Sequence, residues 1–183
     1  MITEYIIKTL KQNKILDSKD EAIVQYGLNG LLSTMFSFLT IFLIGLCCNC
    51  LMESIIFTIS FFFLRIYAGG YHANTPLKCY GISLAISIIL FAIIHNINLH
   101  VWFLHTLFIC SIIIIFKFAP IGTANKSLDS LEIIFFRKKT LNLLIIHIIV
   151  YVISSLLFNY KILWSLSISL TVTMILLIIS KIK

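Results

Sequence analysis

Long stretches almost without charge limit most strongly what this chain can fold into. A helix needs about 20 consecutive apolar residues to cross the hydrocarbon core of a bilayer. Hydrophobic residues make up 60% of the 183 residues and charged residues only 11%, which is more apolar than a soluble domain of this size needs. We therefore predict an all-α, polytopic membrane protein with about six transmembrane helices. The predicted spans are residues 25–46, 53–68, 76–94, 101–118, 141–159 and 161–179.

The N-terminal region is amphipathic. Residues 2–13 place apolar and charged side chains on opposite faces of a helix. Such a helix can lie on the membrane surface or pack against the protein, and both interpretations stay open. Ser18 and Glu21 have the spacing of a capping box, which predicts a second helix that runs into the first span.

We expect one integral membrane domain over residues 1–183. Within it, residues 1–24 form a cytoplasmic or interfacial region, and residues 25–180 hold the transmembrane helices. Residues 1–25 carry many charges and no long apolar run, so a cleavable signal peptide is not expected.

The basic residues are distributed unevenly between the two ends of the predicted helices. With six spans, both termini share one side with the segments after spans two and four. All basic residues except Lys161 fall in the termini, in those segments or at the span ends that adjoin them. Because basic segments stay in the cytoplasm, we expect both termini at the cytoplasmic face of a cell membrane. The net charge of +7 then indicates orientation and contact with anionic lipids, and no nucleic-acid partner is expected.

The cysteines and histidines form no recognisable metal-binding pattern. Five cysteines without paired spacing do not indicate a disulfide framework. The run Cys47–Cys50 fits no standard zinc motif, and we interpret it as small apolar residues at the membrane interface, with lipidation or an exposed redox pair as alternatives. His95, His100 and His105 have no carboxylate near them in sequence, so we expect no metal and no cofactor. His147 falls inside the fifth span, where a neutral ring bonded to another helix is the simplest interpretation.

A polar, glycine-bearing segment at residues 65–79 interrupts the apolar runs of the first half. Thr75 is a favourable N-cap residue and Pro76 suits the first helical position, so a helix is predicted to begin there. Cys79 then falls in the first turn. There the positive end of the helix dipole and the neighbouring Lys78 favour a thiolate.

The same segment carries the imidazole of His72 and the thiol of Cys79, the two groups needed for cysteine-nucleophile catalysis. On one continuous helix their Cα atoms would lie about 10 Å apart along the axis. We therefore predict a loop that folds His72 back over the helix bearing Cys79. The pair Gly69-Gly70 allows a sharp turn or a close approach of the backbone to a bound peptide. From these residues alone, the alternative that Cys79 is an inert residue at a helix start stays open.

The segment also resembles a known family. The context Ala-Gly-Gly-Tyr-His-Ala followed by Cys is similar to the signature of the accessory gene regulator B (AgrB-like) family. The matching positions are Arg65, Gly70, His72 and Cys79. The resemblance extends to residues 20–28, to the Ala-Pro loop at 119–126 and to the basic residues 137–139. Gly122 and Thr123 depart from that loop in the family, which is more often richer in charge and asparagine.

The resemblance implies a membrane-embedded cysteine endopeptidase that processes a quorum-sensing pro-peptide, an AgrD-like substrate. The family's catalytic pair maps onto His72 and Cys79. It would cleave off the C-terminal tail and assist cyclisation through an acyl-thioester, and a homodimer is a further expectation. Residues expected to bind substrate or support the site are Arg65, Gly70, Lys78 and Lys126.

Other functions are open as alternatives. A non-enzymatic membrane protein, such as a small transporter or a peptide-binding subunit, would not need Cys79. A metalloprotease is disfavoured because the sequence lacks His-Glu-x-x-His. Glu21 and Glu53 could orient His72 by residue type alone, and Glu53 is expected at the opposite face of the membrane.

Overall fold

The computed structural model describes residues 2–13, 16, 20–70, 75–96, 99–122 and 128–182. In this part of the chain the regular structure is helical, apart from one isolated β-bridge. This confirms the predicted all-α class. The helices are α1 (Ile2–Gln12), α2 (Glu21–Cys47), α3 (Leu51–Ala68), α4 (Pro76–Asn96), α5 (Val101–Phe118), α6 (Ser130–Leu156) and α7 (Tyr160–Ile182).

Five of the described helices are long and apolar enough to cross a membrane. They are α3, α5, α6, α7 and the part of α2 from Gly27 to Cys47. The apolar part of α4, Tyr80–Ile93, is shorter than these five. The chain is therefore a multi-pass helical membrane protein, as predicted.

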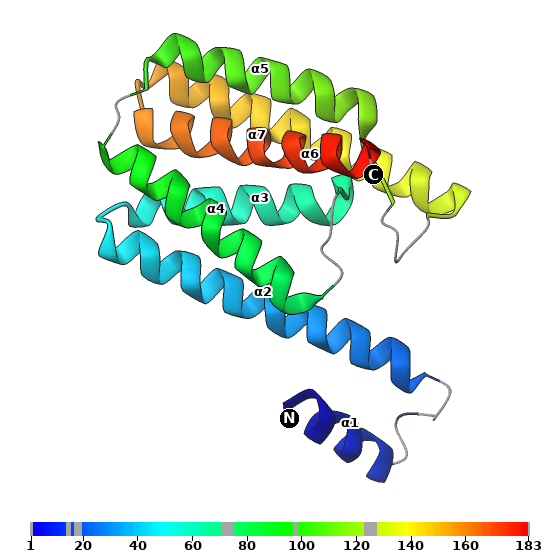
Figure 1. Cartoon of the computed structure of the whole chain (residues 1–183). Helices are drawn as coiled ribbons and strands as arrows, with labels where there is room; N and C mark the ends of the chain where they lie inside the picture. Colours follow the sequence, from blue (N-terminus) through cyan, green and yellow to red (C-terminus); the bar gives the residue numbers. More distant parts are fainter. Residues whose placement is uncertain are drawn as a thin grey trace.

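Successive helices from α2 to α7 run in alternating directions (Figure 1). Helix α7 lies at the centre and packs against α3 and α5, while α4 packs mainly against α2 (Figure 1). One end of the bundle therefore gathers the end of α3, the start of α4, the end of α5 and the start of α6. The opposite end holds Lys161, in the first turn of α7.

Small hydroxyl side chains allow α7 to pack tightly. The buried residues Ser165, Ser167, Ser169 and Thr173 alternate with apolar residues along it. The Ser167 hydroxyl donates to the Leu104 carbonyl of α5 at 3.2 Å. Such contacts matter in a bilayer, because lipid and protein interior are equally apolar and close packing and hydrogen bonds must drive helix association.

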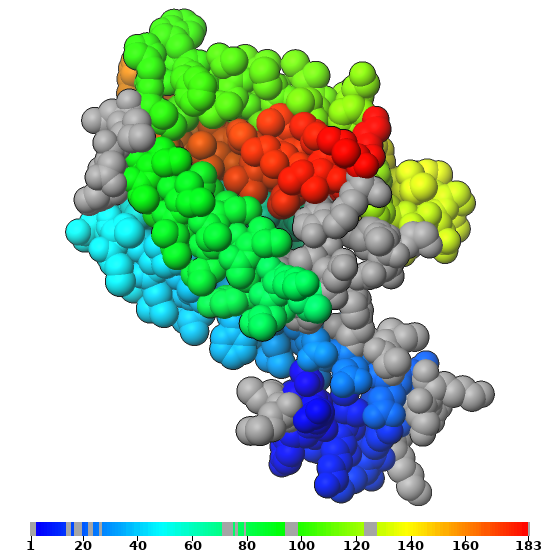
Figure 2. Space-filling view, viewed as in Figure 1, coloured from blue at the N-terminus to red at the C-terminus, as the bar shows by residue number. Residues whose placement is uncertain are grey.

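Helix α1 lies against α2, and together with the start of α2 it projects from the bundle (Figure 2). Ile7 is buried in this contact, and Lys11 forms an ion pair with Glu21. The capping-box prediction is not confirmed, because α2 begins at Glu21 and Asp20 is its N-cap residue. The Glu21 carboxylate pairs with α1 instead, and Ser18 lies outside the described residues.

Helix α6 begins at Ser130, eleven residues before the predicted start of the fifth span at residue 141. The Asp129 backbone N–H donates to Glu132 Oε2 at 3.2 Å, which satisfies one backbone group at the helix start. The basic residues 137–139 therefore lie on a helix.

Candidate functional site

The first turn of α4 is built as the sequence predicted. The helix begins at Pro76, and the backbone N–H of Lys78 donates to Thr75 Oγ1 at 3.3 Å. This places the Cys79 backbone in the first turn, and the Lys78 side chain is exposed. His72 and the other residues 71–74 lie outside the described residues, so the folding of His72 over Cys79 stays a prediction.

Arg65 and Gly70 form one structural unit at the end of α3. Arg65 lies in the last turn, and its Nη1 donates to the carbonyl of Gly69. Gly70 has a φ of +107°, and a Cβ atom there would lie 2.5 Å from Arg65 Nη1 and 3.3 Å from the Leu176 carbonyl. Glycine at position 70 thus lets the guanidinium fold back onto the chain.

The Gly69 backbone approaches another part of the same chain. The Ile121 N–H donates to the Ala68 carbonyl at 3.0 Å, and the Gly70 N–H donates to the Ile121 carbonyl at 3.4 Å. These bonds form the isolated parallel bridge between Gly69 and Ile121. A side chain on Gly69, whose φ is +74°, would collide with the Ile121 carbonyl. The close approach that the glycines permit is therefore made by this chain's own segment 119–122.

Arg137 holds that segment from the other side. Its Nη1 donates to the Ala119 carbonyl, and its guanidinium lies 5.0 Å from the centre of the Phe116 ring. Lys138 and Lys139 are exposed on the same helix. The three neighbouring basic residues therefore differ, since Arg137 bonds a carbonyl of another segment, whereas Lys139 Nζ lies 5.5 Å from the centre of the Phe135 ring on its own helix. Lys126, also expected to support the site, lies outside the described residues.

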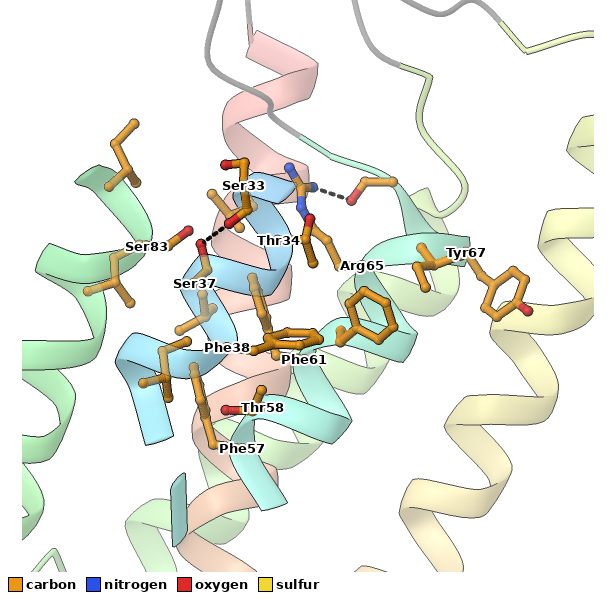
Figure 3. A pocket seen from close by; sticks show the side chains of 18 of the residues that line it. Ser33, Thr34, Ser37, Phe38, Phe57, Thr58, Phe61, Arg65, Tyr67 and Ser83 are labelled. Carbon is orange, nitrogen blue, oxygen red and sulfur yellow. Dashed lines mark hydrogen bonds between the residues drawn. The ribbon is translucent and has the colours of Figure 1, made fainter. Parts of the chain in front are cut away.

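A cavity of about 480 Å³ opens beside the Arg65–Gly69 turn, between α2, α3, α4 and α7. Its volume falls within the roughly 300–1,000 Å³ of small-ligand pockets. Arg65, Gly69 and residues 120–122 line the end nearest that turn. The walls are mainly aromatic and aliphatic, with hydroxyl groups from three helices (Figure 3). The hydroxyl residues are Ser33, Thr34, Ser37, Thr58, Ser83 and Ser87.

The carboxylates considered for orienting His72 are engaged elsewhere. Glu21 pairs with Lys11, and Glu53 lies 3.5 Å from Lys161 at the opposite end of the bundle. Glu53 was expected on the opposite side from His72 and Cys79, and it does lie at the other end of the bundle from the start of α4.

The remaining cysteines and histidines of the described chain have separate surroundings. Burial, together with the neighbouring Cys48 and Glu53, raises the pKa of the Cys50 thiol to about 11, so it stays protonated at neutral pH. His100 Nδ1 accepts from the Trp102 N–H at the start of α5. His105 Nδ1 lies 2.9 Å from the Tyr151 hydroxyl. Among the described residues, no three metal-binding side chains come together.

Comparison with known proteins identifies the family. The family profile described as Accessory gene regulator B matches residues 2–180. The chain belongs to the AgrB family. A putative AgrB-like protein of Clostridium perfringens strain SM101 is 31% identical over 168 residues, which cover 87% of this chain and 78% of the relative.

More distant AgrB relatives support the same assignment. The accessory gene regulator protein B of Staphylococcus saprophyticus is 27% identical over 119 residues, covering 65% of this chain and 63% of that protein. Protein FsrB of Enterococcus faecalis is 27% identical over 147 residues, covering 77% of this chain and 60% of its own. No solved structure matches the chain. AgrB family membership links the chain to accessory gene regulation and quorum-sensing peptide processing.

Two features of this AgrB family member were not predicted from its sequence: the cavity and the hydrogen bond from Arg137 to the Ala119 carbonyl. A partial signal for the cavity was present. Ser33 and Ser37 on α2, and Ser83 and Ser87 on α4, repeat at a spacing of four, which places each pair on one helix face. No comparable sequence signal indicated the hydrogen bond from Arg137 to Ala119, because the two residues lie on different elements.

Proposed function

We propose that this AgrB family member is a cysteine endopeptidase that removes the C-terminal tail of a quorum-sensing pro-peptide and assists its cyclisation. The observation that carries the proposal is the start of α4. There a capped helix holds the Cys79 backbone in its first turn, next to the exposed Lys78. The positive end of the helix dipole and the lysine charge both favour the thiolate, which is the reactive form of cysteine.

The proposed reaction starts with proton transfer from the Cys79 thiol to the His72 imidazole. The sulfur attacks the carbonyl carbon of the scissile peptide bond and forms a tetrahedral intermediate. Backbone N–H groups at the start of α4 are suited to stabilise its oxyanion. The carbon–nitrogen bond then breaks, and His72 returns the proton to the leaving amine. The tail departs, and the rest of the peptide remains bound to Cys79 as a thioester.

Ring closure follows from the same intermediate. A thiol or hydroxyl group within the bound peptide attacks the thioester carbonyl and displaces the Cys79 sulfur. Attack by a thiol gives a thiolactone, which keeps the activated acyl bond, whereas attack by a hydroxyl gives a lactone. The proton of the attacking group returns to the Cys79 sulfur, so the step needs no oxidant and consumes no water.

The charge distribution supports a cytoplasmic location for this chemistry. Among the described residues, Arg65, Lys78, Lys117 and residues 137–139 belong to the bundle end that holds the start of α4. Lys161 belongs to the other end. The positive-inside rule therefore favours Cys79 at the cytoplasmic face, where thiols stay reduced.

Co-expression with an AgrD-like peptide precursor tests the proposal, with intact-mass analysis of both partners. The Cys79→Ala variant is expected to bind the precursor and leave it uncleaved. Cys110→Ala is the matched control, because Cys110 is a free, exposed cysteine on α5, and it should process normally.

A precursor whose ring-closing residue is replaced by alanine should accumulate as an acyl adduct of the enzyme. The adduct should be released by hydroxylamine and be absent from Cys79→Ala. Cleavage by Cys79→Ala at the wild-type rate would reject the mechanism and favour a non-enzymatic peptide-binding protein.

A further inference from the structure

We infer that the cavity between α2, α3, α4 and α7 binds the apolar residues of the peptide that directly precede the cleaved bond. This inference rests on the proposed function, because it assigns a substrate subsite to the proposed nucleophile. It is carried by the register of α4, the hydrogen-bonding capacity of the cavity wall and the division of charge at the cavity mouth.

The register of α4 connects position 79 with the cavity. Ser83 and Ile86 line the cavity, and they follow Cys79 by four and seven residues. Residues at these spacings share one face of a helix. Position 79 therefore lies on the cavity-lining face, about 6 Å along the axis from position 83. Because the start of α4 and the end of α3 lie at the same end of the bundle, this is also the end lined by Arg65 (Figure 1).

The hydroxyl groups of the wall are arranged to accept hydrogen bonds. Thr34, Ser37, Thr58 and Ser87 each donate to the carbonyl four residues earlier in their own helix, at 2.7–2.9 Å. The single proton of each hydroxyl is thereby used, and the oxygen keeps a lone pair for another partner. Figure 3 shows Thr34 and Ser37 on α2 with Thr58 on the neighbouring α3.

A wall of this kind fits a peptide better than a lipid chain. Backbone N–H groups are donors that must be paired when they leave water, and the hydroxyl oxygens can receive them. The apolar walls match aliphatic or aromatic side chains and include Phe38, Phe57 and Phe61 (Figure 3). A lipid acyl chain would fill the same space but has no donor for these oxygens.

The two directions from Cys79 differ in polarity, which decides the side of the cleaved bond. Along α4 from position 79 the cavity leads into the apolar bundle. In the opposite direction lies the bundle end with the exposed Lys78, Lys138 and Lys139. An acidic tail, which is released after cleavage, suits the basic end. The apolar acyl part, which must stay bound until the ring closes, suits the cavity.

A panel of synthetic precursor peptides tests the subsite through cleavage. The residue before the cleaved bond is varied among Gly, Ala, Leu and Phe, and kcat/KM is measured in detergent-solubilised full-length protein. One missing methylene in a hydrophobic pocket lowers kcat/KM by about 10- to 200-fold. Because Gly lacks the whole side chain of Leu, we expect a loss of at least about tenfold from Leu to Gly.

The Ser83→Phe variant, which fills the cavity, should lower kcat/KM for the Leu peptide at least about tenfold and reduce the preference for Leu over Gly. Its matched control is Ala85→Phe, which adds the same side chain to an exposed position of α4 outside the cavity lining. Equal cleavage of all peptides by the wild type would overturn the subsite while leaving the peptidase function intact.

Photo-crosslinking gives a second measurement that needs neither cleavage nor Ser83→Phe. Benzoylphenylalanine replaces Ile82, which lines the cavity, or Ala85 as the control, in the Cys79→Ala protein. We expect the peptide to crosslink to position 82 through its residues before the cleaved bond. The inference would be overturned if position 82 crosslinked only to lipid or to the tail of the peptide. It would also be overturned if position 85 crosslinked to the peptide as strongly as position 82. A crosslink without cleavage by the wild-type protein would reject the peptidase function and keep the subsite.

Discussion

At the scale of single residues, the turn after α3 shows how one side chain dictates its neighbours. Arg65 folds back to the Gly69 carbonyl. At position 70, glycine is the residue type that leaves room for the guanidinium and adopts the positive φ without backbone strain. The arginine and the glycine that resemble the family signature are therefore explained by one local structure. We expect their effect on the proposed reaction to be indirect, through the shape of the turn and of the cavity end beside it.

Replacing Gly70 with alanine is expected to destabilise the protein by about 1–3 kcal/mol, because position 70 has a positive φ and no space for a Cβ. The detergent-solubilised variant should unfold at a lower temperature and process precursor more slowly. Gly81→Ala is the control, since a Cβ there meets nothing within 4 Å in a helix, and it should be neutral or stabilising. A Gly70→Ala melting temperature equal to the wild-type value would contradict this account.

Among the helices, the sequence at its start determines where α4 begins, and side-chain contacts hold α6 against the bundle. The threonine–proline start fixes where α4 begins, and the position of Cys79 follows from it. Helix α6 is tied to the bundle by His147, whose Nδ1 lies 2.7 Å from the Leu143 carbonyl and whose Nε2 lies 2.7 Å from Ser60 Oγ. Because a carbonyl only accepts, Nδ1 carries the proton, and in a neutral ring Nε2 accepts from Ser60.

Thr75→Ala removes the cap of α4 and should cost about 0.5–2 kcal/mol of local helix stability. Amide hydrogen exchange in the first turn should become faster, and processing should slow because Cys79 is less well fixed. Thr75→Ser should restore both. Thr106→Ala is the control, because that hydroxyl bonds a carbonyl within α5 and caps no helix. Unchanged exchange in Thr75→Ala would show that the cap contributes nothing.

The contact between His147 and Ser60 can be measured by a double-mutant cycle with His147→Ala and Ser60→Ala. Interhelical hydrogen bonds within membranes give coupling energies of about 0.6 kcal/mol on average and about 1.7 at most. We expect a value in this range from thermal or denaturant unfolding. Ile146→Ala, at an exposed position of the same helix, should show no coupling with Ser60→Ala. Additive effects of His147→Ala and Ser60→Ala would mean that this bond does not join α3 to α6.

At the scale of the whole molecule, alternating helices separate a basic end from an end with little charge. The basic end holds the start of α4 (Figure 1), and Arg65 and Gly69 at this end line the cavity. Among its charges, the Arg137 guanidinium holds the segment that contacts Gly69, whereas Lys138 and Lys139 are exposed. We therefore expect the structural role at this end to belong to Arg137, and attraction of substrate or lipid to belong to the exposed lysines.

Membrane orientation can be tested by labelling single cysteines in a variant without native cysteines. Cysteine at position 126 or 183 should react with a membrane-impermeant maleimide only after the membrane is opened, because basic segments remain in the cytoplasm. Leu157→Cys, at an exposed position of the opposite end, should react in intact cells. Labelling of position 126 in intact cells would reject the proposed orientation.

The exposed lysines are expected to attract an acidic substrate tail. In the double variant Lys138→Gln and Lys139→Gln, KM should rise about two- to thirtyfold at low salt, since exposed ion pairs contribute about 0.2–1 kcal/mol each. The difference should vanish at about 1 M salt, where charges are screened beyond 3 Å. Arg137→Gln should instead lower the melting temperature at every salt concentration, because its partner is a carbonyl. A KM that is unchanged in the lysine variant at low salt would leave these lysines to orientation and lipid binding.

Local properties of the chain were readable from the sequence. The membrane-spanning helices follow from hydropathy, and the start of α4 follows from Thr75 and Pro76, because both depend on residues adjacent in the chain. Because α4 was predicted to begin at Pro76, the position of Cys79 in its first turn was predicted as well. The family resemblance rested on the same short segment and extended along nearly the whole chain, as the profile match confirmed.

Contacts between distant segments were decided by the tertiary structure. The Gly69–Ile121 bridge, the bond from Arg137 to Ala119 and the cavity each join residues from different elements. Sequence patterns do not reveal such pairs in a membrane protein, because a helix face that meets lipid and one that meets protein are both apolar. Which faces pack, and where a cavity is left between α4 and its neighbours, depends on the fit of side chains across the whole bundle.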